Sequence, residues 1–361
     1  MPFASIRSCY GNGTIIRIQM TDKAKTKKTR RGSGSITLRD VAKLAGVAPI
    51  TASRAVNSPD QVSADVLRKV QDAIARTGYV PNLLAGGLAS SRSRLIAAVV
   101  PSIVVSVFVE MIETLNNTLF DAGYQLMLGQ TGYSSAHEEA LLDAIIGRRP
   151  DGIFLTGILL SAKGRTRLLA SGIPVVETWD LTPTPIDMLI GFSHWAIGRE
   201  VAGFLIAKGR KRLALVRSGD ERANRRAEAF TEVARQHGLG EVVIDNVGDA
   251  RTLKSGREAL RRILWRAPDV DAIFCSSDLL AMGVMTEALA QNIAVPQRLA
   301  IVGFGDVPYV ADMVPALTTV HINGREMGEQ AARFLIDRAE GRTVDQPIVD
   351  IGFYVVERDS A

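Results

Sequence analysis

A chain of 361 residues, 47% hydrophobic and 22% charged, can bury a sizeable core and suits a small domain beside a large one. It holds no apolar run near the roughly 20 residues of a membrane-spanning helix and no export signal, so we expect a cytoplasmic protein. The two cysteines, Cys9 and Cys275, join no Cys/His cluster, which argues against a disulfide framework or a metal site.

The formal net charge of +5 is concentrated at the N-terminus. Residues 1–34 hold eight Lys or Arg and a single acid, Asp22, whereas the rest of the chain holds 35 basic and 37 acidic residues. A basic arm of this kind either contacts the phosphates of a nucleic acid or is a solvated leader. We expect residues 1–34 to be disordered, and Met20, which opens a polar stretch, is a second candidate for the start of translation.

Residues 35–80 are expected to form three short helices. Helical spacing of apolar residues begins at Leu38 and stops at Gly46, a second helix fits residues 49–56, and a third follows Ser63. Thr37 and Ser63 suit the positions that cap a helix N-terminus, because a hydroxyl can accept a hydrogen bond from the first turn. Three short helices with a tight turn between the first two describe a helix-turn-helix module.

From Leu95 onward, short apolar segments alternate with amphipathic ones, which predicts an α/β fold with parallel sheets. The predicted strands span residues 95–100, 125–128, 152–155, 174–177, 188–191, 212–216, 242–245, 272–275, 300–304 and 317–320. The predicted helices span residues 109–122, 136–146, 196–208, 225–237, 254–267, 279–291 and 325–339. Because so many strands exceed one compact sheet, we expect two doubly wound subdomains with a ligand cleft between them. Their expected bounds are residues 94–192 with 321–340, and residues 193–320 with 341–358.

The string from Thr37 to Asn57, TLRDVAKLAGVAPITASRAVN, resembles the helix-turn-helix of the lactose/galactose repressor family. The match continues through residues 62–63, residues 78–82 (GYVPN) and Ala85 to residues 88–89. The resemblance implies a DNA-binding domain over residues 35–80, a hinge helix over residues 81–93, and a homodimer that binds double-stranded operator DNA. The second helix of the domain would then enter the major groove.

The resemblance also implies which residues contact DNA. It places Pro49, Ile50 and Arg54 at base edges, where Arg54 can donate two hydrogen bonds to a guanine and Ile50 can contact a thymine methyl. Asn57 and Thr51 are expected to position phosphates. The whole expected set is Thr37, Pro49, Ile50, Thr51, Ser53, Arg54, Asn57, Tyr79, Asn82 and Leu88.

Two departures from the family pattern limit what can be carried over. Many members have Ser or Thr where Ala48 stands and a polar residue where Ile50 stands, so the helix cap is weaker and the operator cannot be copied from a relative. In the hinge, Leu88 corresponds to the apolar wedge that enters a minor-groove base step and bends the duplex. Gly86 and Gly87 lower the helix propensity there, so we expect the hinge to be helical only on DNA.

The chain beyond the hinge resembles the periplasmic-binding-protein-like core of the same family, and within the family it is most similar to gluconate-operon repressors. This resemblance implies a sugar-acid effector such as gluconate or a ketogluconate. It places Asp278 where a carboxylate accepts hydroxyl groups of a sugar, and Arg226 where a guanidinium can bind the effector carboxylate. Arg226 could instead be a surface cation, and Phe108 could stack on the ligand or belong to the core.

Ser193 and His194 stand where many relatives have Asp-Asn, so the cleft loses an acid that would repel an anion. His194 is a candidate ligand contact or a structural histidine. Glu177, just after a strand end with Asp180, could contact the ligand, pair with Arg226 or order water. The expected effector-binding set is Ser102, Phe108, Glu177, Ser193, His194, Arg226 and Asp278.

Three other classes of protein are alternatives. An enzyme is disfavoured because the chain has no P-loop, no Gly-x-Gly-x-x-Gly after a first strand and only four His, so we expect no catalysis and no cofactor. A transporter's solute-binding protein would need an export signal and would have no helix-turn-helix. A regulator of the same family that answers to a neutral sugar or a nucleoside is the main alternative. The sequence leaves open whether the effector releases the protein from DNA or strengthens its binding.

Overall fold

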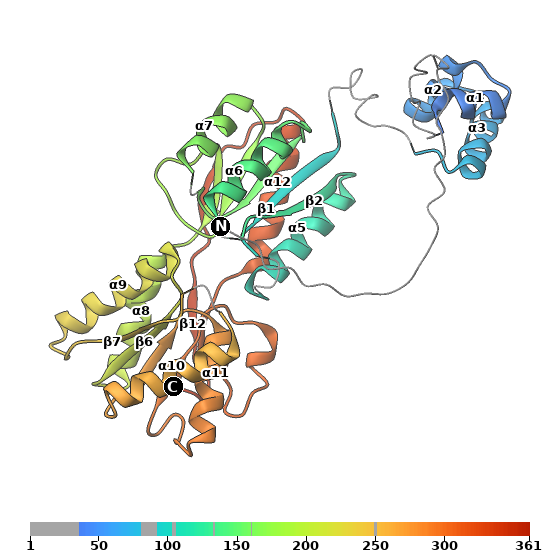
Figure 1. Cartoon of the computed structure of the whole chain (residues 1–361). Helices are drawn as coiled ribbons and strands as arrows, with labels where there is room; N and C mark the ends of the chain where they lie inside the picture. The colour runs from blue at the N-terminus through green and yellow to red at the C-terminus, as the bar shows by residue number, and fades with distance from the viewer. Residues whose placement is uncertain (1–35, 81–91, 103–105, 133, 160, 249–250) are drawn as a thin grey trace, which may run out of the picture. The chain divides into compact units, whose positions relative to one another are not determined.

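Figure 1 shows the computed structural model of the chain, which describes residues 36–80, 92–102, 106–132, 134–159, 161–248 and 251–361. The chain divides into two compact units, Met1–Gly86 and Gly87–Ala361. The expected basic tail, residues 81–91 of the expected hinge helix, and with them Asn82 and Leu88, lie outside the described residues. Within the described part of the chain, no helix is long and apolar enough to cross a membrane.

The first unit contains the three expected helices, α1 (Leu38–Ala45), α2 (Pro49–Asn57) and α3 (Ala64–Thr77), with a short 3₁₀ turn at Pro59–Gln61. The backbone N–H and the hydroxyl of Thr37 both donate to the Asp40 carboxylate at the start of α1, and Gly46 ends this helix with φ +67°. All three helices contribute to one small core, which consists of Val41, Ala42, Ala52, Ala55, Val70 and Ala73.

The second unit begins with a subdomain built on a six-stranded sheet in the order β11-β5-β4-β3-β1-β2, in which every neighbouring pair is parallel. Its strands are β1 (Leu95–Val100), β2 (Gln125–Gln130), β3 (Gly152–Thr156), β4 (Val175–Thr178), β5 (Met188–Gly191) and β11 (Ile348–Asp350). One face of the sheet is covered by α5 (Val109–Asp121) and α12 (Gly324–Ala339), and the other by α6 (Ser135–Ile146) and α7 (Ala162–Ser171). The first subdomain therefore has three layers (Figure 1).

The second subdomain is built on a four-stranded parallel sheet in the order β7-β6-β8-β9. Its strands are β6 (Leu213–Arg217), β7 (Val243–Asn246), β8 (Ala272–Cys275) and β9 (Ala300–Val302). Helices α8 (His194–Ala207) and α9 (Glu221–Gln236) cover one face, and α10 (Leu253–Arg266) and α11 (Asp278–Ala290) cover the other. Because helices cover both faces, a central strand such as β8 is buried along its whole length.

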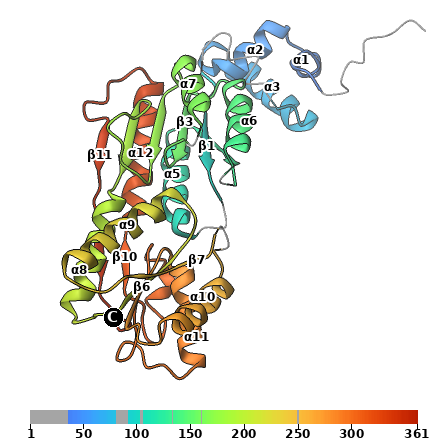
Figure 2. The same cartoon turned by 60° about the vertical axis from the view of Figure 1, so that its left-hand side comes forward.

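An antiparallel pair, β10 (Thr319–His321) and β12 (Tyr354–Val356), lies where the chain passes between the subdomains; β12 is labelled in Figure 1 and β10 in Figure 2. The chain passes from one subdomain to the other after β5, after β10 and after β11. The final residues return to the second subdomain, where the buried Ser360 exchanges hydrogen bonds with Ile301, Ala316 and Thr318. The two subdomains are thus connected by several crossings instead of one.

One expected boundary needs correction. The sequence assigned residues 341–358 to the second subdomain, but β11 pairs with β5 in the first sheet, with Ile348 opposite Leu189. The physical reason is that the edge of β5 needs hydrogen-bond partners, and the Leu189 N–H donates to the Pro347 carbonyl at 2.7 Å. Residues 348–350 therefore belong to the first subdomain.

Candidate functional site

In the helical unit, α2 presents the residues expected at base edges to solvent. Ile50 is 64% exposed, and Pro49 and Arg54 are exposed as well. No side chain caps the N-terminus of α2, because Ala48 at that position offers only a methyl group. The exposed face of α2 therefore combines an apolar group and a guanidinium, which suits contact with base edges.

Other residues expected to contact DNA are hydrogen-bonded or packed within the same unit. The side-chain amide of Asn57 donates to the carbonyl of Ser53 at 3.0 Å and lies 3.3 Å from its hydroxyl. Tyr79 is half-buried against the small core, and Thr51 is half-buried on α2. These contacts fix the end of α2 and the segment after α3.

In the second unit, Arg226 extends from α9 into the protein interior, so it is not a surface cation. It is 4% exposed, its Nη1 donates to Nδ1 of His194 at 2.8 Å, and its Nη2 donates to the Ser276 carbonyl at 3.2 Å. The guanidinium carbon lies 4.0 Å from the centroid of the Phe304 ring. Burial lowers the pKa of Arg226 to about 10. Two of the three guanidinium nitrogens thus already donate to protein atoms.

The tautomer of His194 follows from these partners. An arginine can only donate, so Nδ1 of His194 accepts, and Nε2 carries the proton that it donates to the Trp179 carbonyl at 2.8 Å. Burial, with the nearby charge of Arg226, holds the pKa of His194 well below its usual value. The ring is therefore neutral, and it links the second subdomain to the end of β4 in the first.

Close packing of α8 and α9 brings His194 to Arg226. A Cβ atom at Gly198 would lie 2.1 Å from the Arg226 carbonyl oxygen, so only glycine permits this approach. The Ser193 hydroxyl accepts the Ala196 N–H and caps α8, which places His194 in the first turn. The structure thus gives Ser193 and His194 structural contacts at the start of this helix.

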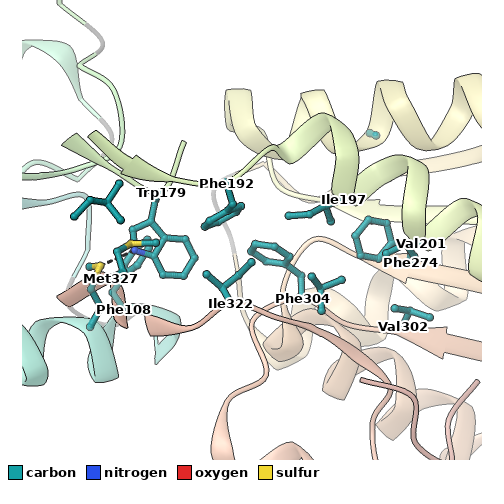
Figure 3. Close-up of a cluster of buried hydrophobic side chains, with 14 of the residues drawn as sticks. Phe108, Trp179, Phe192, Ile197, Val201, Phe274, Val302, Phe304, Ile322 and Met327 are labelled. Carbon is teal, nitrogen blue, oxygen red and sulfur yellow. Dashed lines mark hydrogen bonds between the residues drawn. The ribbon is translucent and has the colours of Figure 1, made fainter. Parts of the chain in front are cut away.

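His194 also belongs to a row of packed rings that runs from the first subdomain into the second, which we call the aromatic seam. Its members are Phe108, Trp179, Phe192, His194 and Phe304, and part of it is drawn in Figure 3. Phe108 packs edge-on against Trp179 with 4.9 Å between ring centroids, Trp179 against Phe192 at 5.4 Å, and Phe192 against His194 at 4.9 Å. Phe304 lies beside the last two rings. Phe108 is 6% exposed and belongs to the hydrophobic core.

The two expected acids are also engaged within the protein. Asp278 is 2% exposed at the start of α11, where it accepts the Thr319 hydroxyl at 2.5 Å and the Val307 N–H at 3.0 Å. Burial raises the pKa of Asp278 to about 6. Glu177 is fully buried in β4, accepts the Ile186 N–H, and has Arg165 instead of Arg226 as its nearest cation, at 4.0 Å. Burial raises the pKa of Glu177 as well.

A cavity of about 310 Å³ lies between the two subdomains, at the carboxyl ends of β1 and β3, and we call it the interdomain cavity. Doubly wound folds bind their ligands at this edge of the sheet. Its polar and charged lining residues are Thr131, Glu138, Thr156, Asp180, Asp220, Glu221, Arg222 and Arg225. None of the seven expected effector residues lines it.

Two carboxylates of the interdomain cavity are paired with arginines. Both oxygens of Asp180 accept from Nη1 of Arg225 at 3.0 Å, which joins the end of β4 to α9 across the cavity. Burial still raises the pKa of Asp180 against the attraction of Arg225. Asp220 accepts from Arg251 at 2.8 Å and from the Ser218 hydroxyl. Although burial opposes it, nearby arginines and this hydroxyl lower the pKa of Asp220.

A second cavity, of about 460 Å³, lies between α5 and β2 and has a mostly apolar lining. Ser102 and Phe108 border it, and the other five expected effector residues border neither cavity. Neither of these two cavities therefore brings the expected effector set together. The interdomain cavity has more of the polar and charged groups that a hydroxyl-rich ligand requires, whereas in the second cavity these are Ser102, Glu113 and Asn116.

Comparison with known proteins identifies the family. Residues 37–82 match the family described as bacterial regulatory proteins, lacI family, and residues 202–361 match the periplasmic binding protein-like domain. The chain is 34% identical over 338 residues to the HTH-type transcriptional regulator GntR of Pseudomonas aeruginosa, covering 93% of this chain and 98% of that protein. The chain belongs to the lacI family of bacterial regulatory proteins.

Solved structures of lacI-family regulators have the same architecture. A regulator from Silicibacter pomeroyi superposes with a TM-score of 0.85 at 32% identity, covering 90% of this chain and 99% of that one. The regulator CelR in complex with cellobiose superposes with a TM-score of 0.65 at 27% identity, covering 90% and 100% of the two chains. As a lacI-family member, this protein is a DNA-binding transcriptional regulator with a periplasmic-binding-protein-like core, and it is not an enzyme.

The lacI-family resemblance drew attention to Arg226 and did not select Arg222, Arg225 and Thr156, which line the interdomain cavity. A signal was present in the sequence, because residues 218–222 directly follow the apolar strand β6 and begin a helix. Residues at the carboxyl ends of parallel strands line the ligand cleft of doubly wound folds. Applied strictly, that rule selects the first turn of α9 and the end of β3.

Proposed function

We propose that the protein is a cytoplasmic repressor that binds operator DNA as a homodimer, and that a sugar acid such as gluconate or a ketogluconate controls its operator affinity. The observation that carries the effector part is the lining of the interdomain cavity, where carboxylates and guanidinium groups occur together. Carboxylates accept hydrogen bonds from hydroxyls, and a guanidinium binds an acid. The similarity of the sequence to gluconate-operon repressors supports the same class of ligand.

The DNA-binding part of the proposal is supported by the exposed face of α2. Arg54 is proposed to donate to a guanine and Ile50 to contact a thymine methyl, with Pro49 at the same groove wall. The remaining positioning contacts are assigned to Thr37, Thr51, Ser53, Asn57 and Tyr79, together with Asn82 and the hinge wedge Leu88.

The proposed coupling between effector and DNA depends on the place of the cavity. A ligand there touches both subdomains, so it favours the arrangement of the subdomains that fits it best. The effector can change operator affinity only by as much as its own affinity differs between the DNA-bound and free arrangements. A change of 1.4 kcal/mol in that difference corresponds to about a tenfold change in operator affinity.

Operator binding with and without effector tests the proposal. The protein first selects its operator from a random DNA pool, and fluorescence anisotropy then measures its affinity with gluconate, 2-ketogluconate, glucose, cellobiose and a nucleoside. We expect a sugar acid to change operator affinity about tenfold or more, and the neutral compounds to leave it unchanged. An effect of cellobiose or the nucleoside alone would favour the neutral-ligand alternative, for which the cellobiose complex of CelR is a precedent.

A further inference from the structure

Two buried polar atoms beside the interdomain cavity have no hydrogen-bond partner among the described residues. They are Nη1 of Arg222, in the first turn of α9, and the hydroxyl oxygen of Thr156, the last residue of β3. Buried polar atoms without a partner are rare in folded proteins, because each one loses its hydrogen bonds to water. Both residues line the interdomain cavity, so a single ligand in it lies close to both side chains.

Arg222 is only weakly engaged by the protein. Its Nε lies 4.0 Å from the Asp220 carboxylate, which already accepts from Ser218, Ala223 and Arg251. Its guanidinium carbon is 6.0 Å from the centroid of the Phe108 ring, at the outer limit of a cation–π contact. Arg222 is therefore attracted by the Asp220 and Asp180 carboxylates, but its Nη1 keeps a donor without a hydrogen-bond partner among the described residues.

The other two arginines nearby are committed elsewhere. Arg225 donates to both oxygens of Asp180 at 3.0 Å. Arg226 is buried against His194 and Ser276 and does not line the interdomain cavity. Of the arginines that line this cavity, Arg222 is therefore the one with an unpartnered donor for an anionic group.

The opposite wall leaves room for the Arg222 side chain. Gly157 follows β3 with φ +107°, a backbone conformation that side-chain-bearing residues rarely adopt. A Cβ atom there would lie 3.4 Å from Nη1 of Arg222, so Gly157 of the first subdomain lies close to the Arg222 guanidinium of the second. The backbone conformation therefore favours glycine at this position, which lies beside the Arg222 guanidinium.

We propose that Arg222 binds the carboxylate of the effector and that Thr156 binds one of its hydroxyls, so that these two residues select a polyhydroxy acid over a neutral sugar. The inference rests on the proposed function and names the residues that give it specificity. Glu138, Asp180 and Asp220 on the cavity wall accept hydrogen bonds from further hydroxyls. Because Thr156 belongs to the first subdomain and Arg222 to the second, the ligand joins the two.

Calorimetric titration of the full chain tests the inference with two ligands of the same carbon skeleton, gluconate and glucitol, of which only gluconate has a carboxylate. For gluconate, we expect Arg222→Gln to weaken binding at least tenfold and Arg222→Lys less, because lysine keeps the charge and loses the planar fork. Thr156→Val removes the hydroxyl and keeps a side chain of similar shape, and we expect it to weaken gluconate binding about twofold to tenfold. Glucitol binding should be the same in the parent and in both Arg222 variants.

Arg235→Gln is the matched control, because Arg235 lies on the same helix, is exposed and pairs with Glu232. It should bind gluconate like the parent protein, and circular dichroism of the unliganded variants should match the parent. Suppose that the parent protein binds gluconate. If Arg222→Gln and Arg222→Lys then bind it as tightly as the parent does, the inference is wrong and the proposed function stands. If the parent binds neutral sugars and no sugar acid, the proposed function fails and the inference fails with it.

Discussion

Asp278 is a buried carboxylate whose protonation contributes to stability. Its pKa is raised by burial from 3.8 to about 6 in the folded protein, so between these values the folded state holds a proton that the unfolded state has lost. The stabilisation from this proton is therefore present at low pH and disappears as the pH rises through about 6. Asp278 is thus a group through which the stability of the second subdomain depends on pH.

We expect the parent protein to lose on the order of 2–3 kcal/mol of unfolding free energy, relative to Asp278→Asn, between about pH 4 and pH 7. Urea denaturation of both proteins across this range measures the difference. Asparagine keeps one acceptor for Val307 and has no proton to lose, so its curve should lack this component. Parallel curves for the two proteins would show that Asp278 titrates at its ordinary value.

His194 holds Arg226 in place through a single nitrogen. In His194→Phe, ring packing against Phe192 is kept, but Nη1 of Arg226 and the Trp179 carbonyl lose their partner. We expect a loss of about 3 kcal/mol in unfolding free energy, because buried polar groups are left unsatisfied. Denaturation of Trp195→Phe, a change at the exposed neighbouring residue, should give a value within about 0.5 kcal/mol of the parent. Equal effects of the two substitutions would contradict the structural role of His194.

The sequence could not decide between Arg222 and Arg226 as the cation of the cavity. The two residues are four apart on α9, so helical periodicity places them on the same face. They differ in depth, since Arg222 lines the interdomain cavity, as Arg225 does, whereas Arg226 is buried against Phe304. That depth depends on how α9 meets α8 at Gly198, which is a property of the packed protein.

Among the elements, α2 carries a prediction about DNA. Arg54 is exposed and forms no part of the small core, so Arg54→Ala should leave the helical unit folded. We expect the variant to lose about 1–3 kcal/mol of binding to the selected operator and to discriminate less at one base pair. Anisotropy titrations with the operator and with a single-base variant measure both effects. Unchanged discrimination would remove Arg54 from the base-contacting set.

Most elements of the core were predictable because their burial follows a simple pattern. β8 is a short run of four buried apolar residues, and each predicted strand and helix of the core has a counterpart in the structure. The missed elements lack such a pattern. Helix α7 buries Leu168 as its one large apolar side chain, and in β11 the outer residues are exposed. Contacts with neighbouring elements stabilise these segments, and such contacts cannot be predicted from the local sequence.

At the scale of the whole second unit, the two subdomains share one hydrophobic core. The cluster that contains Phe154 and Val176 of the first sheet continues through the aromatic seam to Phe274 and Val302 of the second. We expect calorimetry to show one unfolding transition for this unit. Phe304→Ala, at a residue 6% exposed within the seam, should lower its unfolding free energy by about 3–5 kcal/mol without splitting the transition. Two separate transitions would show that the subdomains unfold independently.

The pairing of β11 with β5 affects how the protein can be made. During synthesis, β5 leaves the ribosome well over a hundred residues before β11. The edge of the first sheet at β5 therefore lacks its neighbouring strand while the entire second subdomain is translated. The second subdomain is completed later still, because the hydrogen bonds of Ile301 and Thr318 to Ser360 can form only when Ser360 has been translated. Neither subdomain of the nascent chain can reach its final form early, and both are completed almost together near the end of translation.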